Sequence, residues 1–114
     1  TVLFPPDFEV EFAAMPGSVR RSVATVLVVL RDRGPQLGRP LVDTLNGSVH
    51  PNMKEIRVTA ADGEWRLAFA FDPKRQAIVL CGGDKSGVAQ KLFYRVLIKT
   101  ADERFTAWRE SLEN

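Results

Sequence analysis

Apolar residues recur at intervals of three and four in the first third of the chain, a spacing typical of amphipathic helices. A short strand at 2–4 stops at two prolines, and a helix begins near Asp7, a candidate N-cap. The Pro-Gly pair at 16–17 breaks this helix. Ser18 is a good N-cap for a second helix, which ends at Gly34. So short a turn predicts that the two helices form a hairpin. The buried stripe of the second helix contains Val19, Val23, Val26, Leu27 and Leu30.

The middle of the chain alternates between apolar and polar residues, which indicates strands. Three strands are predicted, at 52–59, 64–71 and 76–81. Asp62-Gly63 is a hairpin signal between the first two strands, and Asp72-Pro73 favours a type I turn before the third.

The segments on either side of these strands complete the predicted fold. Residues 34–52 hold proline and glycine near both ends, so we expect a loop with at most one helical turn at 41–45. From about Gly87 the spacing is helical to the C-terminus, with a candidate kink at Thr100 or Ala101. The order β-α-α-β-β-β-α predicts one α+β domain over 1–114, in which the helical hairpin packs on a twisted antiparallel sheet.

Strand alternation sorts the side chains of this sheet onto two faces. The predicted core face carries Trp65, Leu67, Phe69 and Phe71, and the opposite face carries Glu64, Arg66, Ala68 and Ala70. Arg57 and Arg66 can share this second face, beside alanines that leave open floor. Guanidinium groups over such a floor suit a phosphate, because their donors match its oxygens. The alternative is that the arginines only pair with Glu55 and Glu64 across the hairpin.

Two glycines follow the third predicted strand. Gly82-Gly83 are expected to end the strand and to let the backbone either come close to a neighbour or turn sharply, which would bring Lys85 to the rim of the same floor. The Gly-Gly-Asp-Lys run lacks the spacing of a P-loop, and by itself such a run more often marks a plain strand-to-helix turn.

Composition narrows the class of protein. The chain has 114 residues, 45% hydrophobic and 26% charged, which suits one modest core. A single cysteine, Cys81, allows no intramolecular disulfide and no cysteine metal cluster, in keeping with a cytoplasmic protein. No apolar run is long enough for a membrane span, and the N-terminus lacks the basic start of a signal peptide. Because no Met stands first, we expect further residues upstream.

Charge is unevenly spread along the chain, although the net charge is only +2. Residues 52–99 hold nine bases and five acids, a balance of +4, between two acidic ends. This pattern indicates an anionic partner for the middle segment, although a solvated face is the plainer interpretation.

Several fragments occur together in a fixed order. They are GPQLGRPLVD at 34–43, HPNMKEIR at 50–57, WR with FAFDP within 65–73, and GGDK at 82–85. In this order they resemble the HigB-type toxins of toxin–antitoxin modules, in the RelE/ParE superfamily and particularly its phage-derived branch. The resemblance implies an endoribonuclease that cuts mRNA, usually on the ribosome, without metal or cofactor. It also implies a cognate helix-turn-helix antitoxin, through which alone the toxin would touch operator DNA.

The resemblance also implies a set of site residues. The Glu-x-Arg element of the family matches Glu55 and Arg57, its strand arginine matches Arg66, and its post-strand lysine matches Lys85. The 2′-hydroxyl beside the scissile phosphate would be the nucleophile. The general base stays open between Lys85, Glu55 and Tyr94, since the single histidine, His50, is expected to be a loop residue. Further candidate RNA contacts are Lys54, Lys74, Arg75, Lys91 and Arg95.

Two other functions stay open, because one fold can host different activities. One is a ParE-like toxin that inhibits DNA gyrase without cleaving RNA. The other is a non-catalytic module that only binds the antitoxin. The presence of Arg57, Arg66 and Lys85 together favours the ribonuclease, because pure binding has less need of this trio.

Overall fold

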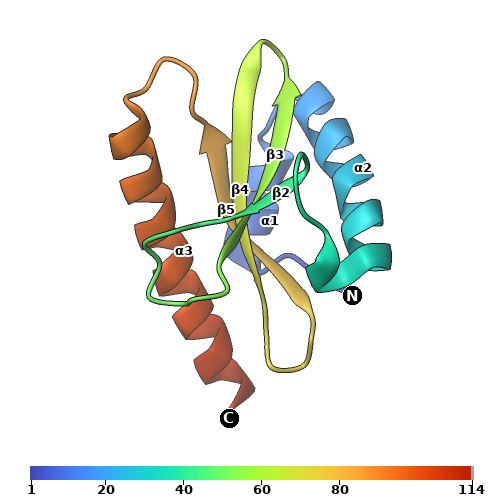
Figure 1. Ribbon diagram of the computed structural model, residues 1–114, viewed down its shortest axis with the longest axis vertical. Coiled ribbons are helices and arrows are strands. Elements are labelled where there is room, and N and C mark those ends of the chain that lie inside the picture. Colours follow the sequence, from blue (N-terminus) through green and yellow to red (C-terminus); the bar gives the residue numbers. More distant parts are fainter. Residues whose placement is uncertain (114) are drawn as a thin grey trace.

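The computed structural model describes residues 1–113 as a five-stranded sheet with helices on both faces (Figure 1). In chain order the elements are β1 (Val2–Leu3), α1 (Pro6–Ala13), α2 (Gly17–Arg33), a short 3-10 helix (Gly34–Gln36), β2 (Val42–Thr44), β3 (Lys54–Ala60), β4 (Gly63–Phe71), β5 (Ala77–Asp84) and α3 (Gln90–Leu112). The strand order is β1-β5-β4-β3-β2. The predicted α+β fold and its element order are confirmed, with β2 as an addition.

The two edges of the sheet differ from the prediction. β2 is a strand where we expected a loop or a helical turn, and its buried Val42 pairs antiparallel with Ile56. Three residues are too few to show alternation. At the other edge β1 runs parallel to β5, with Val2 opposite Ala77, so the sheet is mixed and not wholly antiparallel. The three central strands pair antiparallel, as predicted.

The N-terminal helices begin two residues earlier than their predicted caps imply. Pro5 and Pro16 occupy the N-cap positions of α1 and α2, and no side chain caps either helix. Both prolines have the extended backbone that an N-cap requires, with ψ of 155° and 145°. Asp7 and Ser18 therefore lie in the first turns and do not act as caps.

The last helix begins later than the sequence indicated. α3 begins at Gln90 and not at Gly87, whose φ of 73° places it in a turn. The helix continues without a break through Thr100 and Ala101, the positions of the predicted kink. Residues 90–112 contain no proline or glycine that would interrupt the hydrogen-bond ladder.

A helical layer covers each face of the sheet and gives the fold two cores. The hairpin of α1 and α2 buries Phe8, Val23, Leu30, Ile56, Leu67 and Phe69 against one face. On the other face α3 buries Met53, Ile78, Leu80, Leu97 and Phe105. Figure 1 shows α2 and α3 on opposite sides of the sheet. The predicted packing of the hairpin is confirmed, and the second face proves to be largely core as well.

The predicted alanine floor is therefore wrong. Ala68 and Ala70 are buried in the second core and pack beneath α3. Small side chains at these positions let the helix approach the sheet closely, so protein fills the space that we assigned to a ligand. Trp65 and Phe71, predicted as core, are only partly buried because they lie near the two ends of β4.

The glycines of β5 allow a close approach of their neighbours, which is one of their two predicted roles, and they do not form a turn. The strand runs through Gly82-Gly83 to Asp84, so its predicted end is wrong. A Cβ on Gly82 would lie 2.7 Å from Cγ of Leu67 and 3.2 Å from the Arg66 carbonyl oxygen. A Cβ on Gly83 would lie 3.4 Å from the Phe93 ring. The missing side chains make room for the neighbouring strand and for α3.

The two turns of the central strands differ in how well they were predicted. Ala60 pairs with Gly63, so the β3–β4 loop is Ala61-Asp62, with φ of 51° and 58°, and not Asp62-Gly63. Gly63 is instead a buried residue of β4. A Cβ there would lie 2.6 Å from Oδ2 of Asp84, so this position has no room for a side chain. The predicted turn after β4 is confirmed by the Arg75 N–H, which donates to the Asp72 carbonyl at 2.8 Å.

We expect Gly82→Ala to lower the free energy of unfolding by about 1–3 kcal/mol, because its methyl group would overlap Leu67 and the backbone of β4. Urea unfolding measures the change. Gly38→Ala is the matched control, since Gly38 does not have a positive φ and a methyl group there would meet no atom within 4 Å. Equal stability of the two variants would contradict this close approach of β4 and β5.

Candidate active site

A polar cavity of about 400 Å³ opens on the second face of the sheet, near the start of α3. Its walls come from the segment before β2, from β2 and β3, from the residue after β5 and from the first turns of α3. The charged and polar lining includes Arg39, Asp43, Glu55, Arg57, Lys85, Gln90 and Tyr94. Four of the five predicted catalytic residues thus meet in one cavity, and the fifth, Arg66, contacts Glu55.

Strand register brings these side chains together. Arg57 is directly opposite Arg66 in the β3–β4 pair, and Arg66 is opposite Gly83 in the β4–β5 pair. In the next row Asp43 is opposite Glu55. Alternate residues of a strand point to the same face, so Glu55 lies beside both arginines. The shared face of Arg57 and Arg66 follows from this register.

Glu55 is a buried carboxylate with three partners. Its side chain is 5% exposed. Oε1 accepts a hydrogen bond from the Tyr94 hydroxyl at 2.8 Å and lies 3.7 Å from Nε of Arg66. Oε2 accepts one from Nη1 of Arg57 at 3.3 Å. Burial of a charge requires such partners, so the pairing of arginine with glutamate that the sequence left open is present.

Arg66 lies behind the cavity wall and not on it. Its side chain is 5% exposed, and Nη1 donates to the Trp65 carbonyl at 2.9 Å. Nη1 also lies 3.7 Å from Oε2 of Glu64. Nε is buried and has no hydrogen bond within the described chain. Arg66 can therefore position Glu55, whereas Arg57, with a side chain 26% exposed, is open to a ligand.

Tyr94 comes from the second turn of α3 and reaches the same carboxylate. Burial raises the pKa of Tyr94, and the hydrogen bond and negative charge of Glu55 raise it further. The phenol therefore keeps its proton near neutral pH and serves as a donor more readily than as a base.

Lys85 is held at the cavity by its backbone and by its neighbour. The Lys85 N–H donates to the Glu64 carbonyl at 2.8 Å. Oδ1 of Asp84 accepts from the N–H groups of Glu64 at 3.0 Å and Ser86 at 2.9 Å, and these bonds, Ser86 first, hold the pKa of Asp84 below its usual range. Within residues 1–113, Lys85 forms no ion pair. Its ammonium group is available to a ligand.

The pair of Arg39 and Asp43 was missed by sequence reasoning. Nε and Nη2 of Arg39 donate to Oδ2 of Asp43 at 2.9 and 2.7 Å, and this bond lowers the pKa of Asp43. The available signal was the spacing of opposite charges four residues apart. This spacing did not predict the pair, because we expected a loop here, and residues four apart in a loop need not be in contact.

The predicted RNA contacts do not form one surface, and only Lys91 and Arg95 share helical turns with residues of the cavity wall. Lys91 and Arg95 are exposed on α3, next in sequence to Gln90 and Tyr94 of the wall. Lys54 alternates with Glu55 and belongs to the other face of the sheet. Lys74 and Arg75 lie in the β4–β5 turn, at the far end of these strands from Lys85.

His50 lies apart from the cavity, as expected for a loop residue. Its Nε2 is 3.0 Å from Oγ1 of Thr106, and its ring packs edge-on against Phe105. Cys81 is also outside the cavity, and burial raises its pKa to about 12, so its thiol is not a nucleophile at neutral pH.

Neither a metal site nor a membrane span is found among residues 1–113. No three His, Cys, Asp or Glu side chains gather as metal ligands there. In the same residues every helix is too short or too polar to cross a bilayer.

Known proteins resemble this chain in sequence and in fold. Residues 10–106 match the family described as "Phage derived protein Gp49-like". A Mycobacterium tuberculosis protein named as a candidate toxin, HigB3, is 44% identical over 110 residues, which cover 96% of this chain and 94% of that protein. A second candidate toxin of the same organism, HigB2, is 50% identical over 84 residues, covering 73% of this chain but 41% of HigB2.

A solved structure has the same fold. It is a mutant of the E. coli toxin RelE in the free state, with a TM-score of 0.63 over 90% of this chain and 94% of that one. The two sequences are 17% identical, so this likeness concerns the fold alone.

Proposed function

Because the chain belongs to the Gp49-like family and is a HigB-type toxin of a toxin–antitoxin system, we propose that it is an endoribonuclease that cleaves mRNA. The observation that carries the proposal is the cavity in which Arg57, Lys85 and Tyr94 meet around Glu55. Two of these groups are cations open to a ligand, which suits a polyanion such as RNA.

RNA carries its own nucleophile, so the protein need supply only charge, position and proton transfer. The 2′-hydroxyl oxygen attacks the adjacent phosphorus, and the bond from phosphorus to the 5′-oxygen breaks. The products are a 2′,3′-cyclic phosphate and a 5′-hydroxyl. One proton leaves the 2′-hydroxyl and one joins the 5′-oxygen, so the step balances without a further reactant.

Arg57 and Lys85 take different roles in this step. Arg57 binds the phosphate oxygens, on which negative charge develops, because a guanidinium group keeps its proton throughout. Lys85 lines the same cavity and forms no ion pair within residues 1–113, and we assign proton transfer to it because an amine, unlike a guanidinium group, can exchange its proton. Tyr94 binds the substrate as a hydrogen-bond donor or by stacking on a base.

Glu55 and Arg66 support these groups from behind. Both oxygens of Glu55 face protein donors, which leaves this carboxylate better placed to orient Tyr94 and Arg57 than to accept a proton. Arg66 is buried and acts as a positioning residue through Glu55.

The remaining basic residues extend the substrate surface. Lys91 and Arg95 bind the RNA strand next to the cavity, because they follow wall residues on α3. Lys54, Lys74 and Arg75 lie elsewhere and contact longer RNA or the ribosome. The toxin acts in the cytoplasm on translated mRNA. Its antitoxin carries a helix-turn-helix domain and provides the link to operator DNA.

Mapping of mRNA ends on translating ribosomes tests the activity. Purified wild-type protein is expected to create new internal 5′-hydroxyl ends, and Arg57→Ala is expected to create few or none. The same preparation is assayed for inhibition of gyrase supercoiling. Intact mRNA together with inhibited gyrase would contradict the proposal and support a ParE-like activity, while intact mRNA and active gyrase would indicate a module that only binds.

A further inference from the structure

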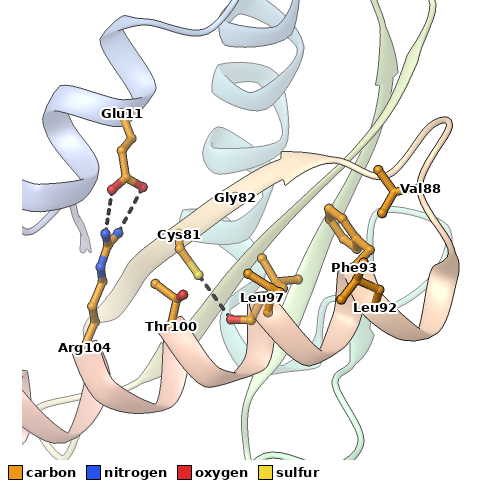
Figure 2. Close-up of a pocket in the computed structure, with 10 residues that line it drawn as sticks. Glu11, Cys81, Gly82, Val88, Leu92, Phe93, Leu97, Thr100 and Arg104 are labelled. Atoms are coloured by element: carbon orange, nitrogen blue, oxygen red, sulfur yellow. Dashed lines mark hydrogen bonds and ion pairs between the residues drawn. The ribbon is translucent and has the colours of Figure 1, made fainter.

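An apolar groove of about 470 Å³ runs between α3, β5 and α1, separate from the polar cavity (Figure 2). Its outer edge is formed by Val88, Leu92 and Val96, which are 43%, 49% and 57% exposed. Single exposed apolar residues are ordinary on protein surfaces, but a contiguous set around a groove marks a binding surface.

The groove has a formed floor and a fixed end. Leu92 and Val96 are one helical turn apart and make an apolar ridge on α3. Phe93 and Leu97 line the groove beside them, and Gly82 of β5 adds no side chain that would fill it. A ligand would therefore find a cavity that already exists, which lowers the entropy cost of binding.

An ion pair closes one end of the groove. Nη1 of Arg104 donates to Oε1 of Glu11 at 3.0 Å and to the Leu80 carbonyl at 2.7 Å, and Nη2 lies 2.5 Å from Oε2 of Glu11 (Figure 2). The pair joins α1 to α3 across β5. Arg104 and Glu11 thus bind each other and need no ligand. A ligand of the groove would therefore contact mainly its apolar floor.

A basic stripe runs beside the apolar ridge. It consists of Lys91, Arg95 and Lys99, three exposed residues that precede Leu92, Val96 and Thr100 in successive turns of α3. None of the three is in an ion pair within residues 1–113. The groove thus combines an apolar interior with a positive margin on its solvent side.

We propose that this groove is the docking site for an acidic amphipathic segment of the antitoxin. Apolar side chains of the segment fill the groove, and its carboxylates pair with the basic stripe. The inference rests on the proposed function, because it takes the chain to be a toxin with a protein antidote. RNA is a poorer occupant, since the ridge and floor offer its phosphates no donors.

Docking here would inhibit the toxin without entry into the cavity. The segment would cover Lys91 and Arg95, the proposed RNA contacts nearest the cavity. Antitoxin and RNA would then compete for the same charges, although the catalytic groups stay uncovered. Bound antitoxin is therefore expected to weaken RNA binding more than it changes the cleavage of RNA already bound.

The test measures antitoxin affinity with groove variants of the full chain. The probe is the product of the adjoining reading frame that restores growth when co-expressed with the toxin. Leu92→Glu and Val96→Glu are expected to weaken binding about 100-fold, because each puts a charge at the centre of the contact. Val28→Glu is the matched control on α2, where Val28 is 50% exposed, and should bind as the wild type does. Lys99→Glu is expected to weaken binding about tenfold and to reduce its dependence on salt.

Each outcome decides the proposal. Wild-type affinity in a folded Val96→Glu, or in Lys99→Glu should Val96→Glu fail to fold, overturns it. The proposal is also overturned if the groove variants keep their antitoxin affinity but lose RNA binding, which would make RNA the occupant. It is likewise overturned if they keep that affinity but lose a self-dimer in sedimentation, which would make a second copy of the chain the occupant. Lost antitoxin binding in a chain whose wild type cuts no mRNA would leave the docking site intact and refute only the ribonuclease.

Discussion

Replacement of Lys85 by arginine is expected to lower the cleavage rate at least about 100-fold while RNA affinity stays near that of the wild type. Arginine preserves the positive charge at the cavity wall but keeps its proton at physiological pH, so it cannot serve in proton transfer. General acid–base catalysis typically contributes roughly 10²–10⁴-fold. Single-turnover cleavage on saturating ribosomes measures the chemical step apart from binding.

Two comparison variants make the result specific. Lys85→Ala is expected to lose cleavage and also some affinity, because the charge itself is gone. Arg20→Lys, an exposed exchange on α2, should change neither. Cleavage by Lys85→Arg at the wild-type rate would reduce Lys85 to a phosphate-binding charge. The base would then be sought at Glu55 or Tyr94, since His50 is bonded to Thr106 outside the cavity.

Glu55→Gln is expected to lower the free energy of unfolding by about 3–5 kcal/mol, the usual cost when one partner of a buried ion pair is removed. The amide can still accept from Tyr94, but Arg66 would keep a buried charge without a counterion on that side. Arg66 already has one nitrogen, Nε, without a hydrogen bond. Urea unfolding followed by circular dichroism measures the loss.

Asp43→Asn is the matched control for that variant. It weakens an ion pair in which Arg39 is 68% exposed, and such surface pairs contribute about 0–1 kcal/mol. If the two variants are equally stable, the positive charge of Arg66 is tolerated without Glu55, and the role of Glu55 lies in the chemistry.

Sequence patterns predicted the elements that carry a strong period. The central strands were found because apolar residues alternate along 64–71, and α2 was found because its valines recur once per turn. β2 was missed because three residues show no period, and its pairing with β3 is a contact between segments that the sequence does not display. The proline caps were missed because a side-chain cap was assumed where the backbone alone suffices.

At the site, too, the strand pattern was predicted and the contacts between distant segments were not. Alternation correctly put Arg57 and Arg66 on one face, but it could not tell what covers that face. α3 lies over Ala68 and Ala70, and only the part near Arg57 stays open. Lys85 does reach this open part, although the reason differs: β5 continues to Asp84, whose carboxylate holds the following backbone. The family resemblance is confirmed by relatives of 44% and 50% identity.

The helix that covers the second face of the sheet, α3, is the last element to be synthesised. A growing chain has β3, β4 and their arginines long before α3, which supplies Tyr94 and the cover of the second core. Until that helix leaves the ribosome, Glu55 lacks its tyrosine donor and the cavity lacks one wall. If the chain acts as the ribonuclease proposed above, a nascent or interrupted chain that ends before Gln90 is expected to be inactive, because it lacks Tyr94 and one wall of the cavity.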